Sequence, residues 1–323
     1  MRKYFKERDV PFIIFLMGPT ASGKTSVVIE LKKQKLGIKI ISVDSALVYK
    51  NMNIGTAKPS VDELEIAPHQ LIDIRDPADC YSVSDFYHDA ILEINKIIRS
   101  GYVPVLVGGT MLYFKTLLTG LYQLPGKSQN IRNDLIYEAQ KIGWVNMYNK
   151  LKCIDPIVSK TIHCNDHKRI IRALEVFLSS GKTLTELKQK FLNQQSQRYK
   201  VLQFALMPSK REFLYNRIEQ RFYKMLKSGF EDEVRLLFSR PDLHDGYQSS
   251  ISCVGYRQMW EYLSGNVEYD QMIYKGIYAT RRLVKNQLTW LKKWPNVHWL
   301  NGDNVLIAVN DMLSVLSKYS CVI

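Results

Sequence analysis

Short apolar runs alternate with amphipathic stretches over the first third of the chain. The runs 12–17, 38–43 and 103–107 are almost wholly apolar, and each ends in a polar or glycine-rich turn, which is typical of strands buried on both faces. Between them, 84–98 has apolar residues at helical spacing behind a serine that can cap a helix, and Gly101 follows its end. Strands that alternate with helices predict an α/β fold with a parallel sheet flanked by helices, in which ligands bind beyond the carboxyl ends of the strands.

The pattern becomes mainly helical in 117–199, where the runs are rich in Lys, Asn and Gln and lack strand-like stretches of comparable strength. We expect this stretch to be an inserted helical domain. The α/β core is then formed by 10–116 together with 200–300, which fits a prior of roughly two compact units for a chain of this length.

The second part of the core begins with 201–206, which predicts a buried strand that returns to the sheet. Residues 211–237 predict one helix, and a turn-rich segment, 241–246, separates it from further helices that run to about Lys293. The last apolar run, 297–300, is short and predicts an edge strand.

A phosphate-binding loop follows the first predicted strand. Residues 18–25 have the pattern G-x-x-x-x-G-K-[ST] and lead into a helix. Glycines let the backbone curl so that successive N–H groups and the helix N-terminus converge on one anion, while the lysine adds a positive charge and the last hydroxyl can bind Mg²⁺. We therefore expect a diphosphate or triphosphate to bind Gly18, Pro19, Thr20, Ala21, Ser22, Gly23, Lys24 and Thr25, with Thr25 as the magnesium ligand.

Polar residues also follow the next two strands. Asp44 comes directly after the second run, where a carboxylate can hold Mg²⁺ in a kinase or take a proton from a nucleophile in a transfer reaction. The alternative is a helix N-cap, for which Asp is well suited. Gly108 and Gly109 follow the third run and permit close approach of a ligand, and Thr110 adds a hydroxyl. We expect three loops to meet at one place: 18–25, 44–50 and 108–113.

The chain is strongly basic. Lys+Arg outnumber Asp+Glu by 45 to 31, which gives a formal charge of +14 and a pI near 9.4. This excess indicates a polyanionic partner, of which nucleic acid is the commonest; a basic surface that only keeps the protein soluble is the alternative. With 46% apolar residues the chain is globular.

Two groups of cations are candidates for anion contacts. Arg217 and Arg221 are four residues apart on the predicted helix and share one face, from which a guanidinium can grip diphosphate; solvation of the surface is the alternative. Further on, 280–294 interleaves cations with two tryptophans and can track RNA phosphates through residues such as Arg281, Arg282 and Lys285. At least one of the tryptophans is expected to pack in the core.

The remaining features concern compartment and metal binding. Five scattered cysteines without a Cys-x-x-Cys pair favour reduced thiols in a cytosol. The sequence His-Cys-Asn-Asp-His at 163–167 has no second pair of ligands at metal-site spacing, which disfavours zinc. The start of the chain is charged, and the run 12–17 is far shorter than the ~20 residues of a membrane span, so we expect a cytoplasmic protein without a membrane partner.

Several longer segments resemble the tRNA dimethylallyltransferases. The resemblance extends from about Phe12 to Leu300, and its most specific segments are G-T-A-K-P at 55–59 and V-G-Y-R-Q at 254–258. Further matching segments are 18–25, 44–49, 69–73, 81–86, 108–113, 169–175 and 280–282. The resemblance implies a P-loop NTPase-like core with an inserted all-helical domain that binds tRNA.

The resemblance also implies an activity. The enzymes of this family transfer the dimethylallyl group of dimethylallyl diphosphate, bound with Mg²⁺, to N6 of adenosine 37 in tRNAs that read codons beginning with U. Asp44 then matches the base that accepts the amine proton, and Thr110 a position beside the adenosine. Either Arg217 or Arg221 would stabilise the departing diphosphate, and the alignment favours Arg221.

The resemblance implies that residues of both domains contact the tRNA anticodon stem-loop. We expect the protein to be a monomer. Two segments depart from the family pattern, namely Gly-Lys-Ser at 126–128 and Ser252, where relatives often carry Ala-Asp and arginine. The zinc-finger extension of eukaryotic members is also missing, which favours a bacterial type. The matching positions are Asp44, Ser45, Ala46, Leu47, Thr110, Arg132, Lys168, Arg169, Ile170, Ile171, Arg172, Ser252, Cys253, Val254, Gly255, Tyr256 and Arg257, to which the basic stretch adds Arg281, Arg282 and Lys285.

Other functions use some of the same residues. A small-molecule kinase would use Lys24 and Asp44 for phosphoryl transfer, although no arginine-rich lid follows the loop. An adenylate isopentenyltransferase would use nearly the same pocket, but the helical insertion and the basic excess favour RNA. A non-catalytic RNA-binding module is the fourth hypothesis.

Overall fold

The computed structural model describes residues 10–34, 36–122, 124–192, 199–244 and 248–319. Contacts divide these residues into two compact units, one from 1–118 with 198–323 and the other from 119–197. The predicted domain boundaries, 117 and 199, lie within two residues of these divisions. In the described ranges, no helix combines the length and the apolar character that crossing a membrane requires.

A parallel sheet of six strands forms the centre of the first unit, in the order β3-β2-β4-β1-β5-β6. Each strand predicted from the apolar runs is present, and the last of them is an edge strand as expected. The short β3 was not predicted because its two residues lack a hydrophobic run. The bounds are β1 Phe12–Met17, β2 Ile38–Val43, β3 His69–Gln70, β4 Val103–Gly108, β5 Lys200–Met207 and β6 His298–Asn301.

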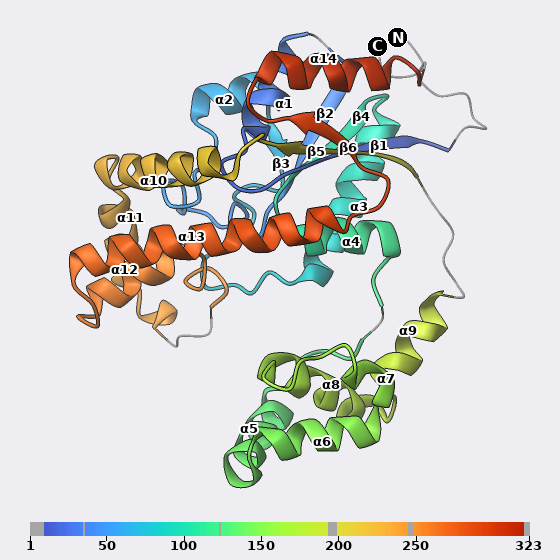
Figure 1. The fold of residues 1–323 in the computed structure, drawn as a ribbon, viewed down its shortest axis with the longest axis vertical. Helices are drawn as coiled ribbons and strands as arrows, with labels where there is room; N and C mark the ends of the chain where they lie inside the picture. The colour runs from blue at the N-terminus through green and yellow to red at the C-terminus, as the bar shows by residue number, and fades with distance from the viewer. Residues whose placement is uncertain (1–9, 35, 123, 193–198, 245–247, 320–323) are drawn as a thin grey trace. The chain divides into compact units, whose positions relative to one another are not determined.

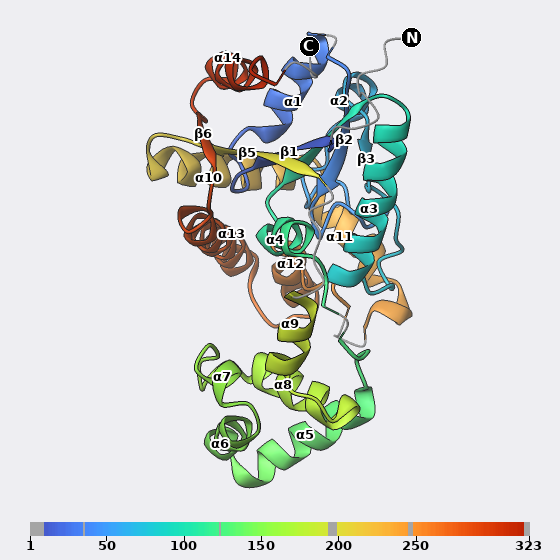
Figure 2. The same cartoon turned by 90° about the vertical axis from the view of Figure 1, so that its right-hand side faces the viewer.

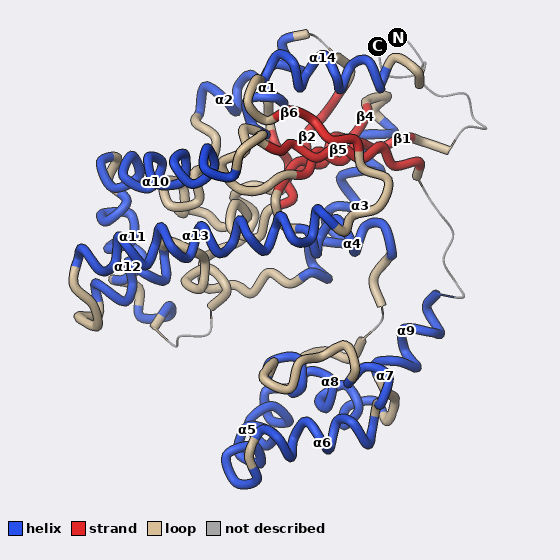
Figure 3. Tube along the Cα trace, in the orientation of Figure 1, coloured by secondary structure: helices blue, strands red, loops and turns tan. Residues whose placement is uncertain are grey.

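Alternating residues of the central strands pack on two layers of helices. Ile14 and Leu16 of β1 belong to a core cluster with α1 (Lys24–Lys33) and α14 (Val305–Leu316). The intervening Phe15 belongs to a second, larger cluster with α3, α4 and α10–α13. Figures 1 and 2 show these layers on opposite faces of the sheet, and Figure 3 shows the strands gathered between them. The sheet is therefore covered on both faces, as predicted.

The helices of the large layer include one correction. Residues 211–237 form two helices instead of one, because Gly229 takes φ +90° and ends the run. A left-handed residue is incompatible with a continuing helix. Strand β4 ends at Gly108 and helix α4 begins at Met111, so only 109–110 of the predicted loop 108–113 form a loop. The bounds are α2 Val61–Ile66, α3 Val83–Arg99, α4 Met111–Thr119, α10 Arg211–Lys227, α11 Phe230–Phe238, α12 Tyr256–Leu263 and α13 Tyr269–Lys292.

The second unit is built from helices and loops in its described part, as Figure 3 shows. Its own small core includes Leu135, Met147, Leu151 and Ile170. The helices that carry these residues thus bury their apolar sides within the unit. The bounds are α5 Gln129–Ile142, α6 Trp144–Ile154, α7 Pro156–Ser159, α8 His167–Ser180 and α9 Leu184–Leu192.

Candidate active site

The predicted phosphate loop connects β1 to α1 and is shaped by its glycines. A Cβ on Gly18 would lie 2.8 Å from the Ser22 Oγ and 2.9 Å from the Leu206 carbonyl oxygen, so no larger residue fits there. Gly23, immediately before α1, has φ +94°. Because only glycine adopts such a conformation readily, the pattern of the loop follows from its backbone.

Lys24 is the charged group of this loop. Its Nζ donates hydrogen bonds to the carbonyl oxygens of Gly18, at 3.0 Å, and Pro19, at 2.7 Å. Burial lowers the pKa of the ammonium group from 10.5 to about 8, while Asp44 opposes this shift and Arg221 adds to it. A second positive centre, Arg221, is therefore close enough to act on the same anion as Lys24.

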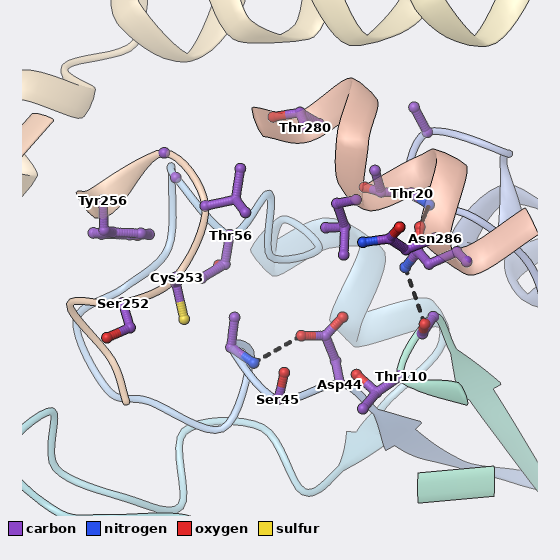
Figure 4. A pocket seen from close by; sticks show the side chains of 18 of the residues that line it. Thr20, Asp44, Ser45, Thr56, Thr110, Ser252, Cys253, Tyr256, Thr280 and Asn286 are labelled. Atoms are coloured by element: carbon purple, nitrogen blue, oxygen red, sulfur yellow. Dashed lines mark hydrogen bonds between the residues drawn. The ribbon is translucent and has the colours of Figure 1, made fainter. Parts of the chain in front are cut away.

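Asp44 stands at the carboxyl end of β2 and faces a cavity. Its Oδ1 accepts hydrogen bonds from the backbone N–H groups of Ala46, at 2.8 Å, and Leu47, at 3.3 Å. No helix follows, so the helix N-cap considered from the sequence is wrong: the residue closes a turn. Within the described residues, no hydrogen bond engages Oδ2. Figure 4 shows the carboxylate between Thr110 and the segment that carries Cys253. This oxygen can accept a proton from a group in the cavity.

The two glycines at the end of β4 make room for neighbouring elements. A Cβ on Gly108 would lie 2.0 Å from the Val43 carbonyl oxygen, and one on Gly109 would lie 2.5 Å from Nε2 of Gln287. Thr110 follows them and lines the same cavity as Asp44. The pair of glycines therefore allows the end of β2 and the helix α13 to meet at Thr110.

Two arginines of α10 reach the phosphate loop. Arg217 and Arg221 both line a chamber of about 350 Å³ with Lys24 and Thr25. Arg217 Nη1 donates to the Gly302 carbonyl oxygen and Arg221 Nη2 to that of Thr56, each at 3.3 Å. Burial also lowers the pKa of Arg221, opposed by the charge of Asp44. Of the two, only Arg221 also lines the adjoining cavity, which agrees with the preference for it in the sequence comparison.

The phosphate chamber adjoins a larger cavity of about 570 Å³. Both are lined by Thr20, Ala21, Asp44, Thr56 and Arg221, so the charged groups stand where the two spaces meet. Beyond them the larger cavity is mainly apolar. Its apolar lining includes Met111, Ile218, Phe222, Met225, Leu283 and Trp290. The arrangement suits a ligand with a diphosphate at one end and hydrocarbon at the other.

The segment 252–257, which was predicted to contact the tRNA, lines another side of the cavity through Ser252, Cys253, Val254, Gly255 and Tyr256 (Figure 4). Burial raises the pKa of the Cys253 thiol to about 12, so this group stays neutral. Arg257 points elsewhere, to an exposed ion pair with Glu261. Ser45 and Ala46 also line the cavity, whereas Leu47 lines the phosphate chamber.

Glu233 was not singled out by its sequence context but organises this side of the site. Its carboxylate accepts hydrogen bonds from the backbone N–H groups of Asn53 and Ile54, each at 2.8 Å, and from that of Gly55 at 3.1 Å. The Tyr256 hydroxyl also donates to it, at 2.5 Å. The acid thus joins the G-T-A-K-P segment to 252–257, although its backbone partners lie about 180 residues away in the chain.

The predicted basic face of α13 is only partly free. Arg281 donates to Glu219 at 2.7 Å and lies over the Tyr215 ring, so it serves as a link to α10. Arg282 and Lys285 are exposed. Of the two tryptophans, Trp294 packs against the core, as expected for at least one of them, and donates to Gln203 at 2.7 Å, whereas Trp290 lines the cavity.

In the helical unit, the predicted RNA-contacting residues differ in accessibility. Arg132 and Arg172 both pair with Glu175, each at 2.9 Å, and this glutamate is fully buried. Ile170 is also fully buried, so its side chain cannot contact RNA directly, because the apolar face of α8 forms the core of the unit. By contrast, Lys168 and Arg169 are exposed and Ile171 is half-buried.

The chamber offers few ligands for a metal ion. The described residues contain no group of three or more His, Cys, Asp or Glu side chains that could hold one. Thr25 lines the chamber near Asp44. This set fits Mg²⁺, which commonly keeps several waters and binds through one or two protein oxygens together with substrate phosphates.

Comparison with known proteins gives consistent matches. The family model described as IPP transferase matches residues 47–294. The tRNA dimethylallyltransferase of Blochmanniella pennsylvanica (strain BPEN) is 61% identical over 305 residues, which span 94% of this chain and 100% of that protein.

Solved structures agree with these matches. The full-length tRNA isopentenylpyrophosphate transferase of Bacillus halodurans is 32% identical with a TM-score of 0.69, over 97% of this chain and 98% of that one. The tRNA delta(2)-isopentenylpyrophosphate transferase of Staphylococcus epidermidis is 33% identical with a TM-score of 0.68, over 96% and 99%. A eukaryotic dimethylallyltransferase that acts on tRNA, 24% identical with a TM-score of 0.79 over 95% and 79%, shares the fold.

Proposed function

The chain belongs to the IPP transferase family, and from this premise we propose that it transfers the dimethylallyl group of dimethylallyl diphosphate to N6 of adenosine 37 in tRNA. The products are N6-(dimethylallyl)adenosine and diphosphate. The observation that carries the proposal is the junction of a phosphate chamber with an apolar cavity at Asp44 and Arg221.

The phosphate loop binds the diphosphate. Residues 20–25, which include the N-terminus of α1, line the chamber, and Lys24 supplies a positive charge. The Thr25 hydroxyl would hold Mg²⁺ there, and the ion, when bound, neutralises charge on the phosphate oxygens. The hydrocarbon end then extends into the apolar cavity.

The transfer requires one bond to form as another breaks. The exocyclic amine of an everted adenine attacks the allylic carbon, the bond from that carbon to the diphosphate oxygen breaks, and Oδ2 of Asp44 accepts the amine proton. Negative charge on the leaving diphosphate grows in the transition state. Lys24 and Arg221 stabilise this negative charge in the transition state, and only interactions that are stronger there than in the ground state accelerate the reaction.

The acceptor is an anticodon stem-loop because the chain combines a basic excess with a cavity large enough for a base. The net charge of +14 favours a polyanion over a free adenylate. Lys168, Arg169, Arg282 and Lys285 are exposed cations at predicted RNA contacts. We further propose that the protein acts as a monomer in the cytoplasm, on tRNAs that read codons beginning with U.

The test is transfer of labelled dimethylallyl diphosphate to a stem-loop with adenosine at position 37. A stem-loop with guanosine there and free AMP serve as controls. Label in the adenosine-37 stem-loop alone supports the proposal. Label in AMP instead would favour an adenylate isopentenyltransferase, and ATP consumption without RNA would favour a kinase.

The role of Arg221 is tested beside that of Arg217. Arg221→Gln should lower kcat by about 10² or more, because it removes a charge from the leaving group. Arg217→Gln, on the same face of α10, should have a smaller effect because Arg217 does not line the larger cavity. Equal losses would contradict the assignment.

A further inference from the structure

Gln287 connects two loops of the site that are far apart in the sequence. It lies on α13 and is 8% exposed. Its Oε1 accepts a hydrogen bond from the backbone N–H of Thr20 at 3.0 Å, and its Nε2 donates to the carbonyl oxygen of Gly109 at 2.9 Å. One side chain thus joins the phosphate loop to the loop that carries Thr110.

The partners set which groups this side chain must offer and how its amide is oriented. Thr20 N–H can only donate and the Gly109 carbonyl can only accept, so the residue between them must offer one acceptor and one donor. A primary amide does so. A carboxylate lacks the donor, and an ammonium or guanidinium lacks the acceptor. The fit is close as well, because a Cβ on Gly109 would lie 2.5 Å from Nε2 and 3.3 Å from the Gly18 carbonyl oxygen.

We propose that Gln287 is a positioning residue, which sets the distance between the diphosphate held by the phosphate loop and the adenine held beside Thr110. The side chain of Gln287 accepts the hydrogen bond of the Thr20 N–H and so holds the backbone of the phosphate loop in place at Thr20. Figure 4 shows Thr20 next to Asn286, the residue before Gln287. The inference rests on the proposed prenyl transfer, and the reacting atoms themselves are not in contact with Gln287.

Because Gln287 lies on α13, it also connects the phosphate loop to the other residues of this helix. Asn286 and Trp290 of this helix line the large cavity, and Lys285 is exposed on its outer face. Any displacement of α13 would therefore be passed to the phosphate loop through the hydrogen bonds of Gln287. Gln287 sets the position of the two substrates relative to each other and does not affect the binding of the diphosphate by Lys24.

Two variants and one control test this role. Gln287→Met keeps the volume and removes both hydrogen bonds, whereas Gln287→Glu keeps the acceptor and, when ionised, loses the donor. Gln271→Met replaces an exposed glutamine of the same helix and is the control. The measurements are melting temperature, affinity for dimethylallyl diphosphate with Mg²⁺ by calorimetry, and kcat and KM for the stem-loop.

Both Gln287 variants should lower kcat by about 10²-fold at neutral pH, because a small misplacement of reacting groups has an effect of this size. The affinity for dimethylallyl diphosphate should stay within about threefold of wild type, since the loop amides and Lys24 still bind it. The control should match wild type in every measurement.

The pH profile of Gln287→Glu separates positioning from mere structural support. Its rate divided by that of wild type should rise as the pH falls from about 8 to about 6, because burial raises the pKa of a carboxyl group and the protonated form can donate to Gly109. This readout holds even if Gln287→Met fails to fold.

A flat ratio with near-normal kcat in the Glu variant would overturn the inference. So would parallel losses of diphosphate affinity and melting temperature in a folded variant, because these would show a structural role alone. Absence of prenyl transfer by the wild-type protein would instead refute the proposed function.

Discussion

We expect the buried charge of Lys24 to lower the free energy of unfolding, compared with that of a variant with an apolar residue at this position. Burial lowers the pKa of the ammonium group from 10.5 to about 8. Since one pKa unit corresponds to about 1.4 kcal/mol, holding the proton in the folded protein costs about 3 kcal/mol at neutral pH. The folded state releases this proton above about pH 8, while the unfolded chain keeps it until about pH 10.5. Stability contributed by this group therefore rises with pH in that window.

Lys24→Met removes the titrating group and keeps a flexible chain of similar length. Without ligand at neutral pH, we expect the variant to melt at a temperature higher by on the order of 5 °C, less any loss from the two hydrogen bonds to the loop carbonyls. The difference in stability between variant and wild type should fall by about 3 kcal/mol as the pH rises through the window. Other titrating groups cancel in this difference.

Calorimetry or circular dichroism at a series of pH values measures the effect, and added diphosphate with Mg²⁺ provides the functional control. The ligand should raise the melting temperature of the wild type and leave that of Lys24→Met nearly unchanged. A difference that stays constant between about pH 7 and pH 10.5 would refute the reasoning, since the buried ammonium would then carry no penalty.

Three further predictions concern catalysis, RNA binding and stability. Asp44→Asn should lower single-turnover prenyl transfer by ~10² to 10⁴ with RNA affinity little changed; an equal loss of RNA binding in filter assays would contradict its role as the base. Arg282→Gln and Lys285→Gln should each reduce the slope of log affinity against log salt by about one unit, whereas Arg281→Gln should mainly lower the melting temperature, because Arg281 pairs with Glu219. Glu233→Gln should destabilise the core by roughly 1 to 3 kcal/mol in urea unfolding, since the carboxylate serves three backbone amides; unchanged stability would argue against that network.

The fold was largely predictable because its central strands are rich in apolar residues. Burial on both faces leaves a strong pattern in 12–17, 38–43 and 103–107, and all three are strands. The break at Gly229 was missed, since one glycine within a helical pattern does not reveal its backbone angle. Helix α14 was missed as well, because 305–309 is a short continuous apolar run, which does not distinguish a helix from a strand.

The candidate site was predictable where a local pattern carries it. The phosphate loop, Asp44 and Thr110 each follow a strand, and parallel strands bring their carboxyl ends to one edge. Gln287 and Glu233 could not be found this way, because the backbone groups to which they bond lie 178 to 267 positions away. The sequence also does not reveal which arginines form an ion pair with a buried acid, as Arg132 and Arg172 do with Glu175.

The position of β1 between β4 and β5 affects how the protein folds while the ribosome synthesises it. Its partner β4 is complete at Gly108, but β5 starts only at Lys200. At a synthesis rate of roughly 5–20 residues/s, the second edge of β1 waits on the order of 5–20 s for its neighbour. During that interval an apolar strand with unpaired backbone groups is open to pairing with other chains. Nascent copies of this protein should therefore depend on chaperones until the helical insertion has been made.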